Sequence, residues 1–185
     1  MNYIATDATF DQQDTLRLTL RRLWDKSKPY GLVAMLNPSR GGVTKDDPTL
    51  SRLSVLMNNN GFGGYTVVNW SPYISSNPED MLRFMHSNSK LARYAMDKNI
   101  ATIKIVTKAA KTAVVAWGNH FPGGQSVDTV LSEYNARFVD AITDGYRRDL
   151  MCFGRTLSGA PKHPLARGQH WIADTTKLMP WIGVH

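Results

Sequence analysis

Leu32-Val-Ala-Met-Leu36 runs directly into Asn37-Pro-Ser39, and this change from a short apolar run to a small polar cluster decides the fold. The same change ends three later runs, at residues 65–68, 113–116 and 150–153. Strands of a parallel sheet that is covered on both faces read as short unbroken hydrophobic runs, and ligands bind beyond their carboxyl ends. We therefore expect the four polar exits to meet at one edge of a sheet.

Helical signals separate these runs. They cover residues 16–26, 48–59, 78–85, 91–110 and 126–140. The first segment has leucines at helical spacing, and the second opens on Asp47-Pro48, an N-cap followed by proline at the first helical position. Strands that alternate with helices form βαβ units. The sequence therefore predicts one α/β domain over residues 1–185, a three-layer α/β/α sandwich with a mostly parallel four-stranded sheet.

Composition narrows the class of protein. The single cysteine, Cys152, lies in an apolar run, so the chain can form neither a disulfide framework nor a thiolate metal site, and the five histidines show no ligand spacing. No apolar stretch approaches the ~20 residues that span a bilayer, and the N-terminus lacks the pattern of a signal peptide. We expect a cytoplasmic protein with no membrane partner and no metal or other cofactor.

Basic residues outnumber acidic ones, and the formal net charge is +7. Such a balance favours polyanionic partners through phosphate contacts and counterion release. A basic surface that only aids solubility is the alternative. Polar and basic side chains close to the exits are expected to contact DNA: Ser39, Arg40, Lys45, Lys162 and Arg167.

The order of the exits resembles the uracil-DNA glycosylase superfamily. Leu36-Asn37-Pro38-Ser39 is similar to the Asn-Pro form of its first motif, and Val67-Val68-Asn69 is similar to the strand whose asparagine reads a pyrimidine. A strand ending in Trp117-Gly118 also recurs there, and the closing motif of that superfamily begins as His163-Pro164-Leu165 does. Over roughly residues 20 to 170 the chain also resembles uncharacterised bacterial and phage domains that carry Asn-Pro-Ser, Asp-Asp-Pro-Thr and His-Pro-Leu.

The resemblance implies a glycosylase-like fold and hydrolysis of the N-glycosidic bond of a flipped-out uracil or modified pyrimidine, in DNA repair or in phage DNA modification. It implies that Asn37 positions water. By its chemistry, His163 is the candidate donor to the departing base. Asp46 has no counterpart in the glycosylases and is a reserve candidate for water activation or for holding a cation. Asn69 would read the base edge. Aromatic rings near the exits would contact the extruded base: Trp70, Tyr73 and Trp117.

Other interpretations stay open. Asn37 and Asn69 are also ordinary turn residues, Asp47 is expected to cap a helix, and Trp70 and Tyr73 equally suit a core. Leu36 stands where the glycosylases have glycine, and residues 165–168 replace a serine-rich tail. These departures favour a module that binds a nucleobase or nucleotide without cutting, or an enzyme that transfers a group to a modified pyrimidine in a phage DNA-modification or defence pathway. The oligomeric state is not predicted.

Overall fold

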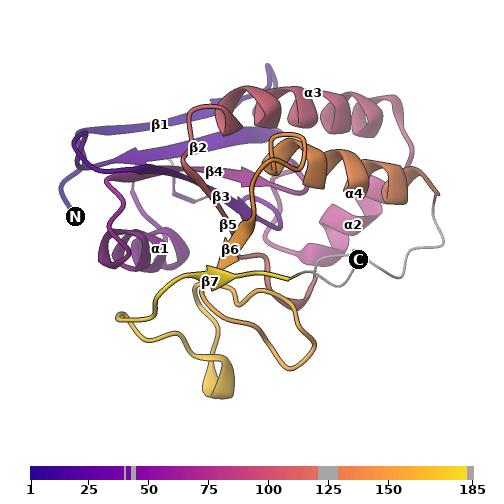
Figure 1. Ribbon diagram of the computed structural model, residues 1–185. Coiled ribbons are helices and arrows are strands. Elements are labelled where there is room, and N and C mark those ends of the chain that lie inside the picture. Colours follow the sequence, from indigo (N-terminus) through magenta and orange to yellow (C-terminus); the bar gives the residue numbers. More distant parts are fainter. Residues whose placement is uncertain (40, 43–44, 121–128, 183–185) are drawn as a thin grey trace.

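The computed structural model describes residues 1–39, 41–42, 45–120 and 129–182 (Figure 1). Its centre is a seven-stranded mixed sheet with the strand order β1-β2-β4-β3-β5-β6-β7. The strands are β1 (Ala5–Phe10), β2 (Arg17–Leu23), β3 (Tyr30–Met35), β4 (Gly64–Asn69), β5 (Thr112–Val115), β6 (Leu150–Cys152) and β7 (Met179–Pro180).

Four neighbouring strands of this sheet are mutually parallel. β3 pairs with β4 on one side and β5 on the other, and β5 pairs with β6. They contain the four apolar runs of the sequence. The expected sheet was too small, however, because β2 and β1 extend it antiparallel to β4, and β7 adds an antiparallel strand at the other edge.

The predicted helix over residues 16–26 is wrong, because this segment contains β2. Leu16, Leu18 and Leu20 are all buried, and their period of two fits a strand as well as their wider spacing fits a helix. β2 pairs with β1 on one edge and with β4 on the other, and all of its seven residues except Arg21 are buried. Tertiary pairing, rather than local preference, sets its conformation.

Helices cover both faces of the sheet. They are α1 (Pro48–Asn59), α2 (Pro78–His86), α3 (Lys90–Thr107) and α4 (Thr129–Ile142). One buried cluster joins α1 to Val33, Val67 and Val114, and a second joins the other three helices to the opposite face of the same strands (Figure 1). The predicted α/β class is therefore confirmed. No described helix has the length and apolarity of a membrane span.

The start of α1 follows the sequence prediction. Asp47 is the N-cap, its Oδ1 accepts from the backbone N–H of Leu50 at 2.8 Å, and Pro48 occupies the first turn. This cap ends the loop that follows β3 and fixes where that loop returns to the sheet.

Residues 154–182 are here called the C-terminal segment. The segment passes beyond the carboxyl ends of the parallel strands, contains the short 3-10 helix η2 (Gly168–His170), and returns to the sheet as β7 (Figure 1). Asparagines at the end of α1 hold its second half. Asn59 Nδ2 donates to Asp174 O at 3.0 Å, and Asn60 Nδ2 donates to Thr176 O at 2.9 Å. The segment therefore forms a covering over the edge at which a ligand is expected.

Candidate functional site

A cavity of about 420 Å³ opens at the carboxyl edge of the parallel strands. Among the described residues, four parts of the chain line it: the end of β3, the start of α2, the exit of β5 and the C-terminal segment between Thr156 and His170. Cavities of roughly 300–1,000 Å³ are usual for small-molecule ligands. The volume suits a nucleoside or a nucleotide better than a larger ligand.

Asn37 lines this cavity, as the sequence predicted for the exit of β3. Its Nδ2 donates to the carbonyl oxygen of Ser75 at 2.7 Å, and the backbone N–H of Ser75 donates to Pro38 O at 3.0 Å. This exchange ties the loop after β3 to the loop before α2. It also fixes the amide, so that Oδ1 is the atom of Asn37 not used in this contact.

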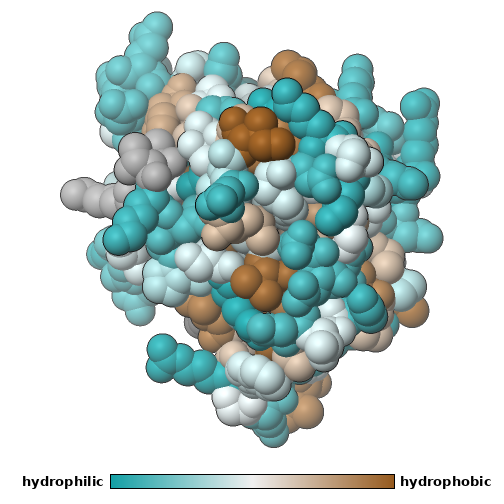
Figure 2. Space-filling model, turned by 90° about the vertical axis from the view of Figure 1, so that its left-hand side faces the viewer, coloured by the Kyte–Doolittle hydropathy of each residue, from teal (hydrophilic) through white to brown (hydrophobic). Residues whose placement is uncertain are grey.

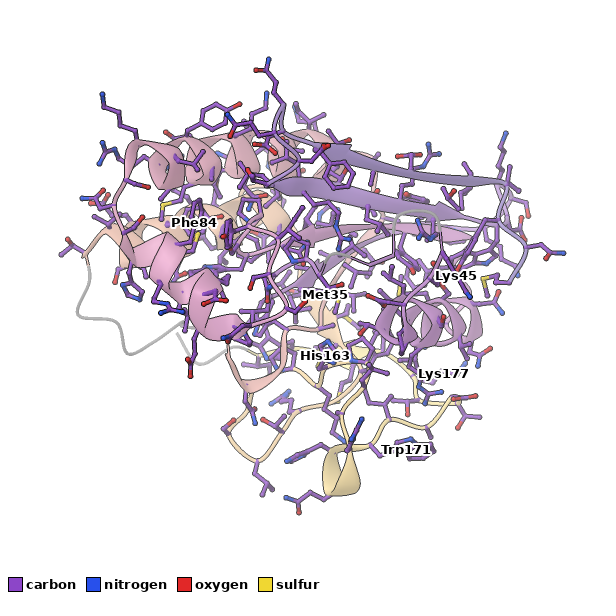
Figure 3. All side chains as sticks on the ribbon, turned by 180° about the vertical axis from the view of Figure 1, so that it is seen from behind. Met35, Lys45, Phe84, His163, Trp171 and Lys177 are labelled. Atoms are coloured by element: carbon purple, nitrogen blue, oxygen red, sulfur yellow. The ribbon has the colours of Figure 1, made fainter. Side chains whose placement is uncertain are left out.

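His163 lines the same cavity and lies near Met35 at the end of β3 (Figure 3). Its Nδ1 accepts a hydrogen bond from the backbone N–H of Leu165 at 3.2 Å. A neutral imidazole whose Nδ1 is an acceptor carries its proton on Nε2. In its neutral form His163 therefore carries its proton on Nε2.

The exit of β5 holds His163 close to the sheet. The backbone N–H of Gly118 donates to Pro161 O at 3.0 Å. Gly118 has a φ of +76°, and a Cβ there would lie 3.4 Å from the Cβ of His163. The positive φ is what favours glycine here, because a Cβ at this position would make only an ordinary contact with His163.

Trp117 forms an apolar wall of the cavity and is only 3% exposed. Its ring packs edge-on against Trp181, with 5.2 Å between the ring centroids. The centroid of the Phe138 ring lies 6.3 Å from that of Trp117. These neighbours fix the indole, so Trp117 gives the cavity a rigid aromatic side.

Sequence reasoning missed three polar lining residues, Asn119, Thr156 and His170. Thr156 Oγ1 donates to Asn119 Oδ1 at 2.7 Å, so this pair links the β5 exit to the C-terminal segment. Asn119 could have been found, because it directly follows the Trp117-Gly118 exit. Thr156 and His170 carry no comparable signal, since only the fold of the segment brings them to the cavity.

Asn69 does not line the cavity. The β3–β4 ladder continues beyond it, because the backbone N–H groups of Trp70 and Ser71 donate to Met35 O and Leu36 O, each at 2.9 Å. The strand therefore leaves the sheet later than its sequence suggested. The side chain of Asn69 is 2% exposed, and its Nδ2 has no hydrogen-bond partner among the described residues.

Two of the expected stacking residues belong to the core. Trp70 is fully buried, and its Nε1 donates to Asn135 Oδ1 at 2.6 Å. Tyr73 stacks on Phe84, with 4.3 Å between centroids and 10° between ring planes. Of the three predicted aromatic contacts, the structure brings Trp117 to the cavity and leaves Trp70 and Tyr73 outside its lining.

Asp46 is held elsewhere. Arg22 Nε forms an ion pair with its Oδ1 at 2.8 Å, and the hydroxyl of Tyr3 donates to its Oδ2. Burial, reinforced by the hydrogen bond to Asp46, raises the pKa of Tyr3. Asp46 is thus part of an ion pair that attaches the loop after β3 to β2, and it does not line the cavity.

Arg17, which the sequence did not single out, holds the same loop. Its Nη1 donates to Gly41 O at 3.0 Å and to Ser39 O at 3.3 Å. Burial lowers the pKa of Arg17 to about 10, which still leaves it charged at neutral pH. Ser39, expected at DNA, instead donates its Oγ to Asp47 Oδ2 at 3.1 Å, beside the helix cap.

Some of the basic residues predicted to contact DNA lie near the cavity and others do not. Arg167 lines the cavity, and Lys162 lies next to His163 with its Nζ 3.5 Å from Trp171 O. Lys45 is exposed beside α1, away from His163 (Figure 3). Arg40 falls outside the described residues. A basic rim is therefore present on the side of the C-terminal segment.

The charge of the cavity itself is simple. Among the described residues that line it, Arg167 carries the one permanent charge, and none is acidic. The described part of the chain also contains no cluster of three or more histidine, cysteine or acidic side chains arranged to hold a metal ion. The arrangement suits an uncharged or anionic ligand that accepts hydrogen bonds.

Comparison with known proteins gave one match. A family described as a protein of unknown function (DUF1643) matches residues 17–165. No curated protein and no solved structure matches the chain. The matched region includes β2 through His163 and Leu165, and so contains most of the cavity lining.

Proposed function

The chain belongs to the DUF1643 family, whose function is unknown, and we propose that its cavity binds a pyrimidine base turned out of a DNA strand and hydrolyses the N-glycosidic bond. One observation carries the proposal: Asn37 and His163, from opposite ends of the matched region, line the same cavity. The motif resemblance to uracil-DNA glycosylases, noted on these two residues, supports the same chemistry.

The bond breaks heterolytically. The bond between C1′ and the base nitrogen opens, and its electron pair leaves with the base. Water adds its oxygen to C1′, and the proton that it loses passes through solvent to the departing base anion. His163 Nε2–H would donate to a base oxygen as negative charge develops there. Oδ1 of Asn37 would accept from the attacking water and orient it, although an amide is too weak a base to remove its proton.

The remaining lining fits a flat heterocycle. Trp117 supplies a fixed aromatic wall, and the 420 Å³ volume accommodates a base with its sugar. An extruded base exchanges stacking in the duplex for stacking and hydrogen bonds in the enzyme. Arg167 at the cavity and Lys162 beside it are placed to contact phosphates of the same strand.

DNA as the partner is also supported by the net charge of +7. The cysteine content agrees with the cytoplasmic setting that the proposal requires, because Cys152 is a buried free thiol. Burial raises its pKa, so this thiol is not a competing nucleophile in the proposed reaction.

A screen for base release tests the proposal. Oligonucleotides that carry uracil, hydroxymethylated pyrimidines or glucosylated pyrimidines are incubated with the protein, and free base is measured by chromatography. We expect one class to release its base and to acquire an alkali-labile abasic site, and the His163→Ala protein to release it far more slowly. If no base is released from any member, the proposed hydrolysis is wrong.

Binding without cleavage is a second candidate, and one observation favours it. No carboxylate is present among the described lining residues, so the cavity holds no strong general base. A sensor or subunit would bind the modified strand in a salt-dependent way and leave the glycosidic bond intact. The same chromatography, combined with a binding assay, separates the two candidates.

A further inference from the structure

The C-terminal segment carries an unusual share of the exposed apolar side chains. Of the twelve large ones exposed in the described part of the molecule, five lie here: Leu157, Leu165, Trp171, Met179 and Ile182. Trp171 is the largest of them, and it is 61% exposed. A single exposed aromatic ring is ordinary on a protein surface, so its meaning depends on the charges around it.

The charge of the same segment is positive. It contains Arg155, Lys162, Arg167 and Lys177 but one acidic residue, Asp174. Asp174 forms an ion pair with Arg52 of α1, which removes it as a repulsive group for an anion. The segment therefore complements a polyanion.

The structure holds the Trp171 ring in place. The guanidinium carbon of Arg52 lies 5.8 Å from the ring centroid, and Arg52 is itself fixed by Asp174 and by the carbonyl of Ile172. Lys162 Nζ lies 3.5 Å from Trp171 O, on the same stretch of chain. The indole is thus an exposed ring whose position is fixed by Arg52. Figure 3 shows Trp171 in the C-terminal segment.

Trp171 directly follows His170, which lines the cavity. Trp171 itself is not among the described lining residues, because its ring packs against Arg52 of α1. A strand with one base in the cavity and its backbone along the C-terminal segment would bring a neighbouring base toward Trp171.

We propose that Trp171 is a stacking platform for a base adjacent to the one in the cavity, on a single-stranded stretch of nucleic acid whose phosphates follow Lys162 and Arg167. The inference rests on the proposed function and adds to it the path of the strand. Stacking on a ring face requires a base that is already unstacked, so the platform selects a single strand over an intact duplex.

A protein partner fits this surface less well. Figure 2 shows the side of the molecule on which α1 and β1 lie in Figure 1, and hydrophobic side chains there form separate patches that hydrophilic residues surround. Protein interfaces bury a contiguous apolar centre, whereas single-strand binding sites combine isolated aromatic rings with cations. The composition of the C-terminal segment matches the second pattern.

Fluorescence anisotropy of a short unmodified single-stranded oligonucleotide tests the platform. We expect Trp171→Ala to weaken binding about tenfold, Trp171→Phe to retain most of the affinity, and Tyr94→Ala, an exposed aromatic on α3, to leave it unchanged. With a strand that lacks bases, Trp171→Ala should bind as the wild type does. Equal affinity of wild type and Trp171→Ala for the normal strand would overturn the platform.

The platform and the hydrolysis fail in different ways. If the hydrolysis is wrong, the wild type releases no base, but binding of the oligonucleotide still depends on Trp171. If the platform is wrong, the wild type and Trp171→Ala bind the oligonucleotide with the same affinity, whereas the wild type still releases base. Thermal unfolding of Trp171→Ala checks that the exposed side chain can be removed without loss of the fold.

Discussion

Asn37 and Asn69 follow two neighbouring parallel strands, yet they have different surroundings. Asn37 is two residues past the end of β3, lines the cavity and has one end of its amide tied to Ser75. Asn69 is opposite Met35 within the ladder, where two more backbone hydrogen bonds follow before the chain leaves the sheet. The comparison teaches that the last sheet hydrogen bond, and not the last apolar residue, decides which polar side chain reaches the site.

The largest effect is expected on the cavity side, at His163. His163→Ala removes the Nε2–H donor and should lower the rate of base release about a thousandfold, within the range for general acid catalysis. Single-turnover release of base measures it. His170→Ala, which alters the same cavity lining, is the matched control and should cost less than tenfold; equal losses would mean that neither histidine has a special role.

The two asparagines are compared directly. Asn37→Ala removes the water-orienting oxygen and should reduce base release about a hundredfold. Asn69→Ala should change the rate of base release less than threefold, because the side chain of Asn69 is buried and does not line the cavity. The same base-release assay on both variants tests this. A larger loss of activity for Asn69→Ala than for Asn37→Ala would mean that Asn69, and not Asn37, acts at the site.

A third prediction concerns the buried side of the comparison. Asn99 Nδ2 donates to Asn69 O at 2.8 Å, to Trp70 O at 3.2 Å and to the hydroxyl of Tyr134 at 2.8 Å. Asn99→Leu breaks these bonds inside the core and should lower the free energy of unfolding by about 2 kcal/mol. Urea denaturation measures it, with Lys98→Leu on the exposed face of α3 as the neutral control. An unchanged midpoint for Asn99→Leu would show that this network does not support β4.

The smallest effect is a pH dependence of the same network. Complete burial raises the pKa of Tyr134 above its ordinary value of 10.0. The unfolded chain therefore loses this proton above pH 10 while the folded chain keeps it, so stability is full below pH 10 and falls as pH rises toward the folded pKa. At pH 11 the loss is about 1.4 kcal/mol for this tyrosine.

Urea denaturation at pH 9 and pH 11 checks this, with Tyr134→Phe as the comparison. The variant should lose about 1.4 kcal/mol less than the wild type between the two values. Identical losses would place Tyr134 outside the core in solution. Tyr65, whose pKa burial also raises, should make both proteins less stable at the higher pH.

Local signals predicted the parts of the fold that depend on neighbours in sequence. Asp47-Pro48 specified the start of α1 because a cap and a proline act within one turn. The four buried parallel strands were evident for a similar reason. β2 was not, since Leu16, Leu18 and Leu20 fit two periods and only pairing with β1 and β4 selects the strand.

The site was predicted in part. Asn37, His163, Trp117 and Arg167 line the cavity, and each lies at a strand exit or beside the His-Pro motif. Asp46 was misplaced because its partner, Arg22, comes from the strand that the sequence presented as a helix. Trp70 was predicted at the site but lies in the core, where its Nε1 donates to Asn135 Oδ1. This contact joins segments that are distant in sequence, so no local pattern could predict it.

The account depends most directly on the cavity between Asn37 and His163 as the place where the base binds. Histidine-selective NMR tests this during titration with pyrimidine nucleotides whose bases range from uracil to hydroxymethylated and glucosylated forms. We predict a saturable shift of the His163 imidazole signals, assigned with His163→Ala, while the signals of His86 at the end of α2 stay fixed. Unchanged His163 signals with every nucleotide, or shifts confined to His86, would contradict the account.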